Sequence, residues 1–225
     1  MTHVINLDGE HLTLEDVIAV ARHGAICEID QEAKKAVEAS RKIVDDIVRE
    51  KRVVYGVTTG FGSLCNVSIS PEDTTQLQEN LIRTHSSGYG DPLPEDAVRA
   101  IMLIRINSLV KGYSGIRLST VEKLLELLNK GVVPYIPEKG SLGASGDLAP
   151  LAHMVLPMLG LGRAYYQGQL HSGQEALAKA GIEKIALAAK EGLALINGTT
   201  VLTGIGALAT YDAIQLLKLS DVAGA

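Results

Sequence analysis

The chain has 225 residues, of which 46% are apolar and 21% are charged. A chain of this length can bury roughly 70–75% of its unfolded surface, and a mean hydropathy of +0.17 excludes a mostly disordered protein. The net charge of −5 and the lack of a basic stripe argue against nucleic acid as a partner.

The N-terminal residues and the cysteines indicate the compartment. Residues 4–7 predict a short strand, and no basic segment followed by an apolar run precedes them, so we expect no signal peptide and a cytoplasmic location. Cys27 and Cys65 belong to no C-x-x-C pattern, which argues against a disulfide framework or a zinc-thiolate site. The histidines show no metal-ligand spacing either, so we expect no metal.

Helix signals then follow in chain order. Asp30 precedes apolar residues at helical spacing as far as Val48. Ser70 and Pro71 are typical of an N-cap and a first helical residue, and this helix is expected to end at Gly88. Further helices are predicted over 94–112, and over 119–131, where Ser119 and Glu122 have capping-box spacing. Residues 164–170 predict a hairpin, and the class is mainly α.

The C-terminal segment is unusually apolar. Residues 192–211 carry no charge and are long enough to span a membrane, but the Asn197–Thr200 segment and the recurring glycines favour buried helices and no membrane contact. The helix predicted over 200–219 is apolar on most of its circumference, so neighbours are expected on every side. Either another subunit covers this helix, or the sequence is a piece of a longer protein.

The glycine-rich segment 139–153 admits several interpretations. It resembles a phosphate-binding turn, but no Lys-Ser or Lys-Thr follows its last glycine. A nucleophile elbow would need Gly-x-Ser-x-Gly, and this segment is one residue short of it. It also fits a simple helix start at Leu148 capped by Asp147.

A further chemistry is open to the Ala144-Ser145-Gly146 tripeptide. The nitrogen of Gly146 can attack the carbonyl carbon of Ala144 if the loop bends tightly, and glycine keeps the approach uncrowded. Loss of one water closes a five-membered ring, and loss of the Ser145 hydroxyl as a second water leaves an exocyclic methylidene. The product is an electrophile, a role that no ordinary side chain fills.

These residues resemble the signature of the aromatic amino acid ammonia-lyase family, whose Ala-Ser-Gly matures into 4-methylideneimidazol-5-one. Segments 54–62, 107–117 and 195–199 resemble further family motifs in the family's order. The resemblance implies the N-terminal portion of a fumarase/aspartase-like helical lyase fold, with an incomplete central bundle. By the same resemblance the chain has two parts. Residues 1–196 form a helical domain that carries the ring, and residues 197–225 form the first long helix of the central bundle.

The resemblance also implies roles for single residues. Thr84-His85 occupies the substrate-selectivity position with a pair close to the Ser-His of histidine-specific members, so L-histidine is the expected substrate, deaminated to trans-urocanate and ammonia. Tyr55 would remove the β-proton, His85 would contact the substrate imidazole, and Asn197 would contact substrate and ring. The plain alternatives are a tyrosine on a mobile loop, a core histidine, a helix-capping asparagine and an uncyclised tripeptide at 144–146.

Family members are longer than this chain. Their second half supplies an arginine for the substrate carboxylate and further site residues, and their sites combine residues of several subunits of a homotetramer. The chain is therefore expected to be a fragment that is inactive alone. The alternatives are a short non-catalytic member that acts in assembly or binding, and a phenylalanine or tyrosine ammonia-lyase or aminomutase.

Overall fold

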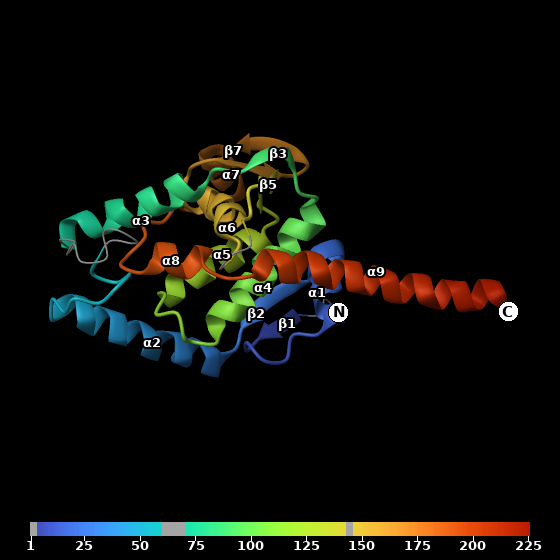
Figure 1. The fold of residues 1–225 in the computed structure, drawn as a ribbon, viewed down its shortest axis with the longest axis horizontal. Helices are drawn as coiled ribbons and strands as arrows, with labels where there is room; N and C mark the ends of the chain where they lie inside the picture. The colour runs from blue at the N-terminus through green and yellow to red at the C-terminus, as the bar shows by residue number, and fades with distance from the viewer. Residues whose placement is uncertain (1–3, 60–70, 143–145) are drawn as a thin grey trace.

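A computed structural model describes residues 4–59, 71–142 and 146–225, and for 71–73 it describes the backbone alone. Helices dominate these ranges, which confirms the mainly α class (Figure 1). The helices are α1 (Leu14–His23), α2 (Gln31–Arg49), α3 (Pro71–His85), α4 (Glu95–Val110), α5 (Leu118–Asn129), α6 (Leu148–Val155), the 3-10 helix η2 (Leu156–Leu159), α7 (Gly173–Ala180), α8 (Glu191–Ile196) and α9 (Thr200–Gly224). The strands are β1 (Val4–Leu7), β2 (Ile26–Ile29), β3 (Tyr89–Pro92), β4 (Val133–Pro134), β5 (Pro137–Lys139), β6 (Arg163–Tyr166) and β7 (Gln169–Ser172).

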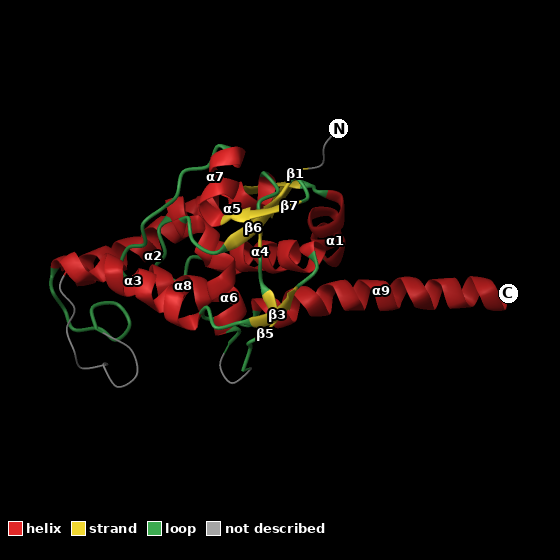
Figure 2. Ribbon diagram, turned by 90° about the horizontal axis from the view of Figure 1, so that it is seen from above, coloured by secondary structure: helices red, strands yellow, loops and turns green. Residues whose placement is uncertain are grey.

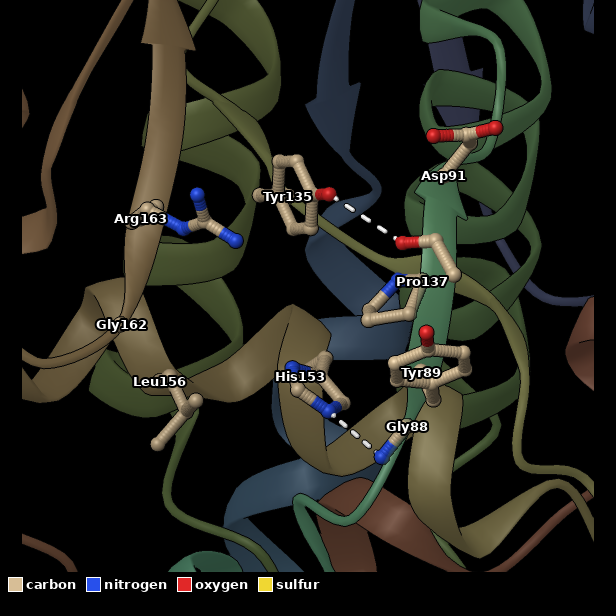
Figure 3. A pocket seen from close by; sticks show the side chains of 10 residues that line it. Gly88, Tyr89, Asp91, Tyr135, Pro137, His153, Leu156, Gly162 and Arg163 are labelled. Atoms are coloured by element: carbon tan, nitrogen blue, oxygen red, sulfur yellow. Dashed lines mark hydrogen bonds between the residues drawn. The ribbon is translucent and has the colours of Figure 1, made fainter.

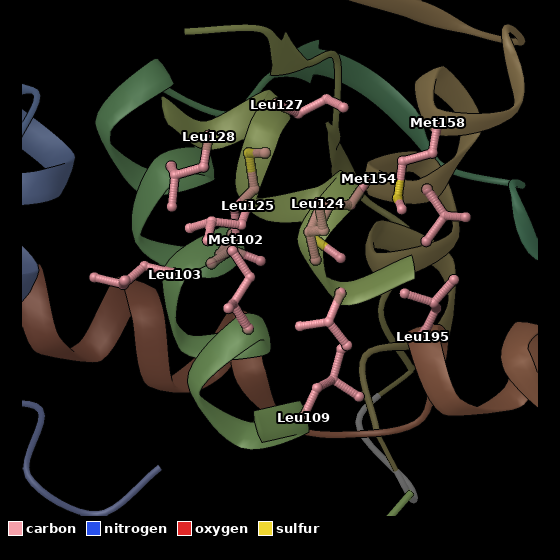
Figure 4. Packing of buried hydrophobic residues seen from close by; sticks show 14 of the residues in the cluster. Met102, Leu103, Leu109, Leu124, Leu125, Leu127, Leu128, Met154, Met158 and Leu195 are labelled. Carbon is pink, nitrogen blue, oxygen red and sulfur yellow. The ribbon is translucent and has the colours of Figure 1, made fainter. Parts of the chain in front are cut away.

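The core is built around α4, which packs against α1, α5 and α9. Three consecutive residues of α4, Ile101, Met102 and Leu103, are fully buried. Consecutive helical residues point in different directions, so their burial requires neighbours around the whole circumference. Figure 4 shows Met102 and Leu103 among the leucines of α5 and the methionines that follow from α6 and η2.

Within the described ranges, the strands form three small sheets. β1 and β2 pair in parallel, β3 and β5 pair antiparallel, and β4, β6 and β7 form an antiparallel sheet (Figure 2). The predicted strand over 4–7 and the predicted hairpin are both confirmed. Gln167 and Gly168 at the hairpin turn both have positive φ, of 51° and 74°, as a tight turn between two twisted strands requires.

The predicted helix ends are partly confirmed. Asp30 caps α2 by accepting the amides of Glu32 and Ala33 at 2.8 and 3.3 Å. The predicted end of α3 is wrong, because the helix ends at His85 and the Gly88 amide is bonded outside the helix. The predicted capping box at Ser119 is also wrong, since α5 begins at Leu118 without a side-chain cap.

α9 leaves the body of the molecule as a long rod (Figures 1 and 2). Its buried residues are Thr200, Val201, Gly204 and Leu208. Within this chain α8 is buried, whereas much of α9 is exposed, with Leu202 71% and Leu217 65% exposed, because α4 and α1 cover only one side of its first half. The neighbours expected around α9 are therefore not supplied by this chain, and the expectation that another subunit or further chain covers the helix stays a prediction. Residues 191–224 are long and apolar enough to cross a membrane, which is weak evidence, since core helices of soluble proteins pass the same test.

Candidate active site

The end of α3, the glycine-rich loop and the start of α6 line an open cavity of about 370 Å³. Ala144 and Ser145 lie outside the described residues, but the loop lines the cavity on both sides of them. The structure therefore brings the predicted selectivity pair and the glycine of the predicted ring to one cavity. Its lining residues are Thr84, His85, Ser87, Gly140, Leu142, Gly146, Leu148 and Ala149.

Gly146 lies against the segment that joins α8 to α9. Its φ is +144°, and a Cβ here would lie 3.0 Å from the backbone nitrogen and oxygen of Gly198 and 3.2 Å from Oδ1 of Asn197. Neither this backbone conformation nor this space suits a side chain, so the position needs glycine. The predicted site residue Asn197 thus holds its amide oxygen beside the glycine of the predicted ring.

Asp147 fixes the same junction. Its amide donates to the carbonyl of Gly198 at 2.7 Å, and its Oδ1 accepts from the Ser141 hydroxyl at 3.1 Å. The predicted capping of α6 by the Asp147 side chain is wrong, because no such hydrogen bond forms. Its Oδ2 instead accepts the first-turn amides of α9, where the helix dipole favours a negative charge.

His85 is the last residue of α3, and its ring is half-buried. Its Nδ1 lies 2.8 Å from the carbonyl oxygen of Leu81. A carbonyl only accepts, so Nδ1 carries the proton, and the neutral ring then has its lone pair on Nε2. The Thr84 hydroxyl donates to the same carbonyl at 3.2 Å. In its neutral form the His85 ring therefore offers Nε2 as a hydrogen-bond acceptor for a ligand N–H.

Arg105 of α4 binds the backbone of Asn197. The guanidinium donates through Nη2 to the carbonyl of Asn197 at 3.0 Å and to the carbonyl of Ala194. Arg105 is only 4% exposed, and burial lowers its pKa to about 10. It thus keeps its positive charge at neutral pH. The guanidinium lies at the last turn of α8 and fixes the backbone of Asn197 through these hydrogen bonds.

The structure does not bring Tyr55 to this cavity. Tyr55 lies in a turn after α2, its side chain is 60% exposed, and it is not among the residues that line the cavity. The turn is fixed nearby, because Val57 is buried against Val44 and Ile47 of α2. Residues 60–62 of the same motif lie outside the described residues. The role of Tyr55 stays a prediction.

Three anchoring residues escaped sequence reasoning: Arg105, His153 and Glu191. Each bonds backbone groups of segments distant in the sequence, so no local spacing marks it. One signal was available for Glu191, which is one of the two charges, with Asp212, that border the uncharged stretch 192–211. A charge that is buried beside an apolar segment needs a partner, but the sequence does not tell which of these two charges is buried.

The chain belongs to the aromatic amino acid lyase family, whose sequence pattern matches residues 12–225. Over its whole length it is 99% identical to the histidine ammonia-lyase of Streptococcus sanguinis, and it covers 44% of that protein. The chain thus spans less than half the length of the relatives it matches.

Solved structures show the same likeness. Histidine ammonia-lyase from Trypanosoma cruzi matches with a TM-score of 0.91 and 43% identity, over 98% of this chain and 42% of that one. A tyrosine aminomutase from Streptomyces globisporus matches with a TM-score of 0.89 and 40% identity, over 94% of this chain and 40% of that one. These likenesses confirm the predicted partial helical lyase fold.

Proposed function

We propose that this chain is the N-terminal part of a histidine ammonia-lyase, which converts L-histidine to trans-urocanate and ammonia. The observation that carries the proposal is the joint placement of His85 and Gly146 on one cavity, with the Asn197 amide oxygen beside Gly146. Membership of the family and the identity to the S. sanguinis enzyme support it.

The described residues fit a 4-methylideneimidazol-5-one made from Ala144-Ser145-Gly146. Gly146 has no room for a Cβ and is held in a left-handed conformation, and the Asp147 amide is bonded to Gly198. The C-terminal end of the loop is thereby fixed, and on its N-terminal side the Ser141 hydroxyl donates to Asp147 at 3.1 Å. A strained backbone persists only where its surroundings over-determine it. When formed, the group would supply an electrophile that makes an amino group a competent leaving group.

The residues of this chain would bind and orient the substrate. His85 Nε2 would accept the N–H of the substrate imidazole, because Nδ1 is already bonded to Leu81. Asn197 would contact both the substrate and the ring that forms at Gly146. We assign proton removal from the β-carbon to Tyr55, acting in the site of another subunit, since its exposed side chain does not line this cavity. Such positioning supplies a large part of a rate enhancement.

The proposal includes a homotetramer in the cytoplasm, with an amino acid substrate and no nucleic acid or membrane partner. The division into a ring-bearing domain over 1–196 and a bundle helix over 197–225 is part of it. The exposed apolar side of α9, which includes Leu216 and Leu217, supports burial in an assembly, because patches of this kind mark interfaces. Among the residues that the structure describes, no group of three His, Cys, Asp or Glu could hold a metal.

The test compares this chain with a full-length chain, in which the same residues continue to the length of the S. sanguinis relative. We expect the full-length chain to form urocanate, followed by its ultraviolet absorbance, and its intact mass to lack two waters in the peptide around Ser145. Ser145→Ala is the control and should show the full mass and no turnover. A full-length chain with the ring but without urocanate would overturn the substrate assignment.

A second candidate is a lyase or aminomutase for another aromatic amino acid. The observation that favours it is the likeness to the tyrosine aminomutase, which is nearly as strong as that to the histidine enzyme. Turnover of histidine, tyrosine and phenylalanine by the same full-length preparation separates the two. Preference for tyrosine or phenylalanine would show that the interpretation of Thr84-His85 is wrong.

A further inference from the structure

Gly88 lies where three segments of the chain meet. Its amide donates to Nε2 of His153 at 3.0 Å (Figure 3). A Cβ on Gly88 would lie 2.9 Å from that nitrogen and 3.1 Å from Cγ of Pro137, and a Cβ on Gly140 would lie 2.9 Å from the Gly88 Cα. The backbone just after His85 is therefore in contact with α6, with β5 and with the loop of the predicted ring.

His153 belongs to the helix that follows this ring. α6 begins at Leu148, directly after Gly146 and Asp147, and His153 stands further along the same helix. The bond to Gly88 thus joins the exit of α3 to the element that carries the C-terminal end of the loop. A second bond, from the Ser87 amide to the His85 carbonyl at 2.8 Å, makes the chain between His85 and Gly88 compact. A shift of Gly88 would therefore move His85.

The bond depends on a neutral imidazole, because only that form has a lone pair on Nε2. Burial holds the pKa of His153 below its usual value, and the charge of Arg163 acts in the same direction. A cavity of about 480 Å³ opens beside the ring. The titratable and charged groups on the strands and loops around it are Tyr89 and Asp91 of β3, Glu138 and Lys139 of β5, Tyr135 between β4 and β5, and Arg163 of β6. The helices α3 and α8 also pack against α6, and they carry Glu79, Arg83 and His85, and Glu191.

We propose that His153 is a positioning residue of the lyase site: by accepting the Gly88 amide, it sets the distance between Thr84-His85 and the loop of the predicted ring. This inference rests on the proposed function and assigns His153 no contact with substrate. The site must hold the substrate imidazole at His85 and the amino-bearing end of the substrate at the loop of the predicted ring at the same time. A small change in the distance between the two therefore weakens binding of histidine.

The experiment uses the full-length chain with His153→Leu and His153→Gln. Leucine removes the acceptor, whereas the glutamine Oε1 can accept the same amide. We expect His153→Leu to raise KM for histidine about 10-fold with a smaller change in kcat, as expected of a displacement well below 1 Å. His153→Gln should restore KM to within about 3-fold, and the two-water mass deficit should persist in both variants.

A pH profile separates positioning from folding. As the pH is lowered through the folded pKa of His153, which lies below its usual value, the wild-type KM should rise more steeply than that of His153→Gln, because protonation removes the acceptor only in the wild type. The imidazole of the substrate titrates in the same range in both assays, so the ratio of the two KM values isolates His153. Superimposable profiles, or an unchanged KM in His153→Leu, would overturn the inference.

Hydrogen exchange gives a readout that needs no turnover. We expect faster exchange at the Gly88 amide in His153→Leu and near wild-type exchange in His153→Gln. Equal protection in all three proteins would refute the role of His153, whatever the activity. A wild-type chain that forms no urocanate but shows the expected exchange pattern would instead refute the proposed substrate and leave the His153–Gly88 bond established.

Discussion

The carboxylate of Asp147 accepts the backbone amide of Val201 at 2.9 Å, and the same oxygen accepts the amide of Leu202 at 3.1 Å. The first amides of a helix have no partner inside it, so Asp147 satisfies two that α9 cannot. Asp147 directly follows Gly146, and its own amide is bonded to Gly198. The loop of the predicted ring is therefore fixed to the start of α9 through main chain and side chain together.

Replacement of Asp147 by alanine should destabilise the protein by about 2 kcal/mol. The change removes an N-cap at the positive end of a helix dipole and leaves the buried amide of Val201 and the partly buried amide of Leu202 unsatisfied. Urea denaturation of this chain measures the loss. The matched control is Asp221→Ala at an exposed position near the other end of α9, which should change stability by less than about 0.5 kcal/mol. Equal midpoints for the two variants would contradict the assignment.

Sequence reasoning recognised Asp147 as a capping residue but assigned it to the wrong helix. The local rule places a cap beside the helix that follows in the chain, and it holds for Asp30 and α2. The partners of Asp147 lie 54 and 55 residues further on. Only the packed fold brings these segments together, so their pairing could not be predicted from spacing.

The start of α5 also depends on a partner that is distant in the sequence. A buried carboxylate, that of Glu191, is bonded there in place of the expected capping box. Glu191 is fully buried. Its Oε1 accepts the Arg117 amide at 3.0 Å and the Thr120 hydroxyl at 2.7 Å. Its Oε2 accepts the Ala188 amide at 2.7 Å and Nη2 of Arg117 at 2.6 Å. One side chain thus joins the starts of α5 and α8.

Glu191→Ala should lower the free energy of unfolding by about 3 kcal/mol, because it leaves the Arg117 and Ala188 amides and the Thr120 hydroxyl without their acceptor. Glu191→Gln should lose less, since the amide oxygen still accepts. Thermal or urea unfolding measures both, with Glu183→Ala, at an exposed position nearby, as the control. A loss for Glu191→Ala no larger than for the control would rule out this role.

The candidate site could be predicted in part. The resemblance supplied His85 and Asn197, and the structure brings both to the region of Gly146. The helical spacing correctly placed His85 one turn after the buried Leu81. The supporting residues Arg105 and His153 were missed because they bond backbone groups, which carry no residue-type signature. Ala144 and Ser145 lie outside the described residues, so ring closure itself stays a prediction.

Gly146→Ala should prevent closure of the ring in the full-length chain. The added Cβ would meet Gly198 at 3.0 Å in a conformation that side chains rarely adopt, so the loop must move away from Asn197. We expect the full mass, without the loss of two waters, and urocanate formation reduced at least about 100-fold. Gly206→Ala in α9 is the matched control, because a Cβ there meets nothing within 4 Å. A two-water deficit in Gly146→Ala would contradict the prediction.

Stability should depend on pH through His153. Burial keeps its pKa in the folded protein below the ordinary value of about 6.5, so the unfolded chain binds more protons in the interval between the two values. The free energy of unfolding therefore falls as the pH is lowered from 6.5 toward the folded pKa, and below that value this contribution levels off. His153→Gln lacks the titrating group, so its stability should fall less between pH 7.5 and pH 5.

His11 has its pKa raised by its hydrogen bond to Asp8, so its contribution to stability changes with pH in the opposite direction. This contribution is the same in both proteins, and the difference between their unfolding free energies therefore reports His153 alone. Parallel curves over this range would show that His153 is not held neutral by the fold.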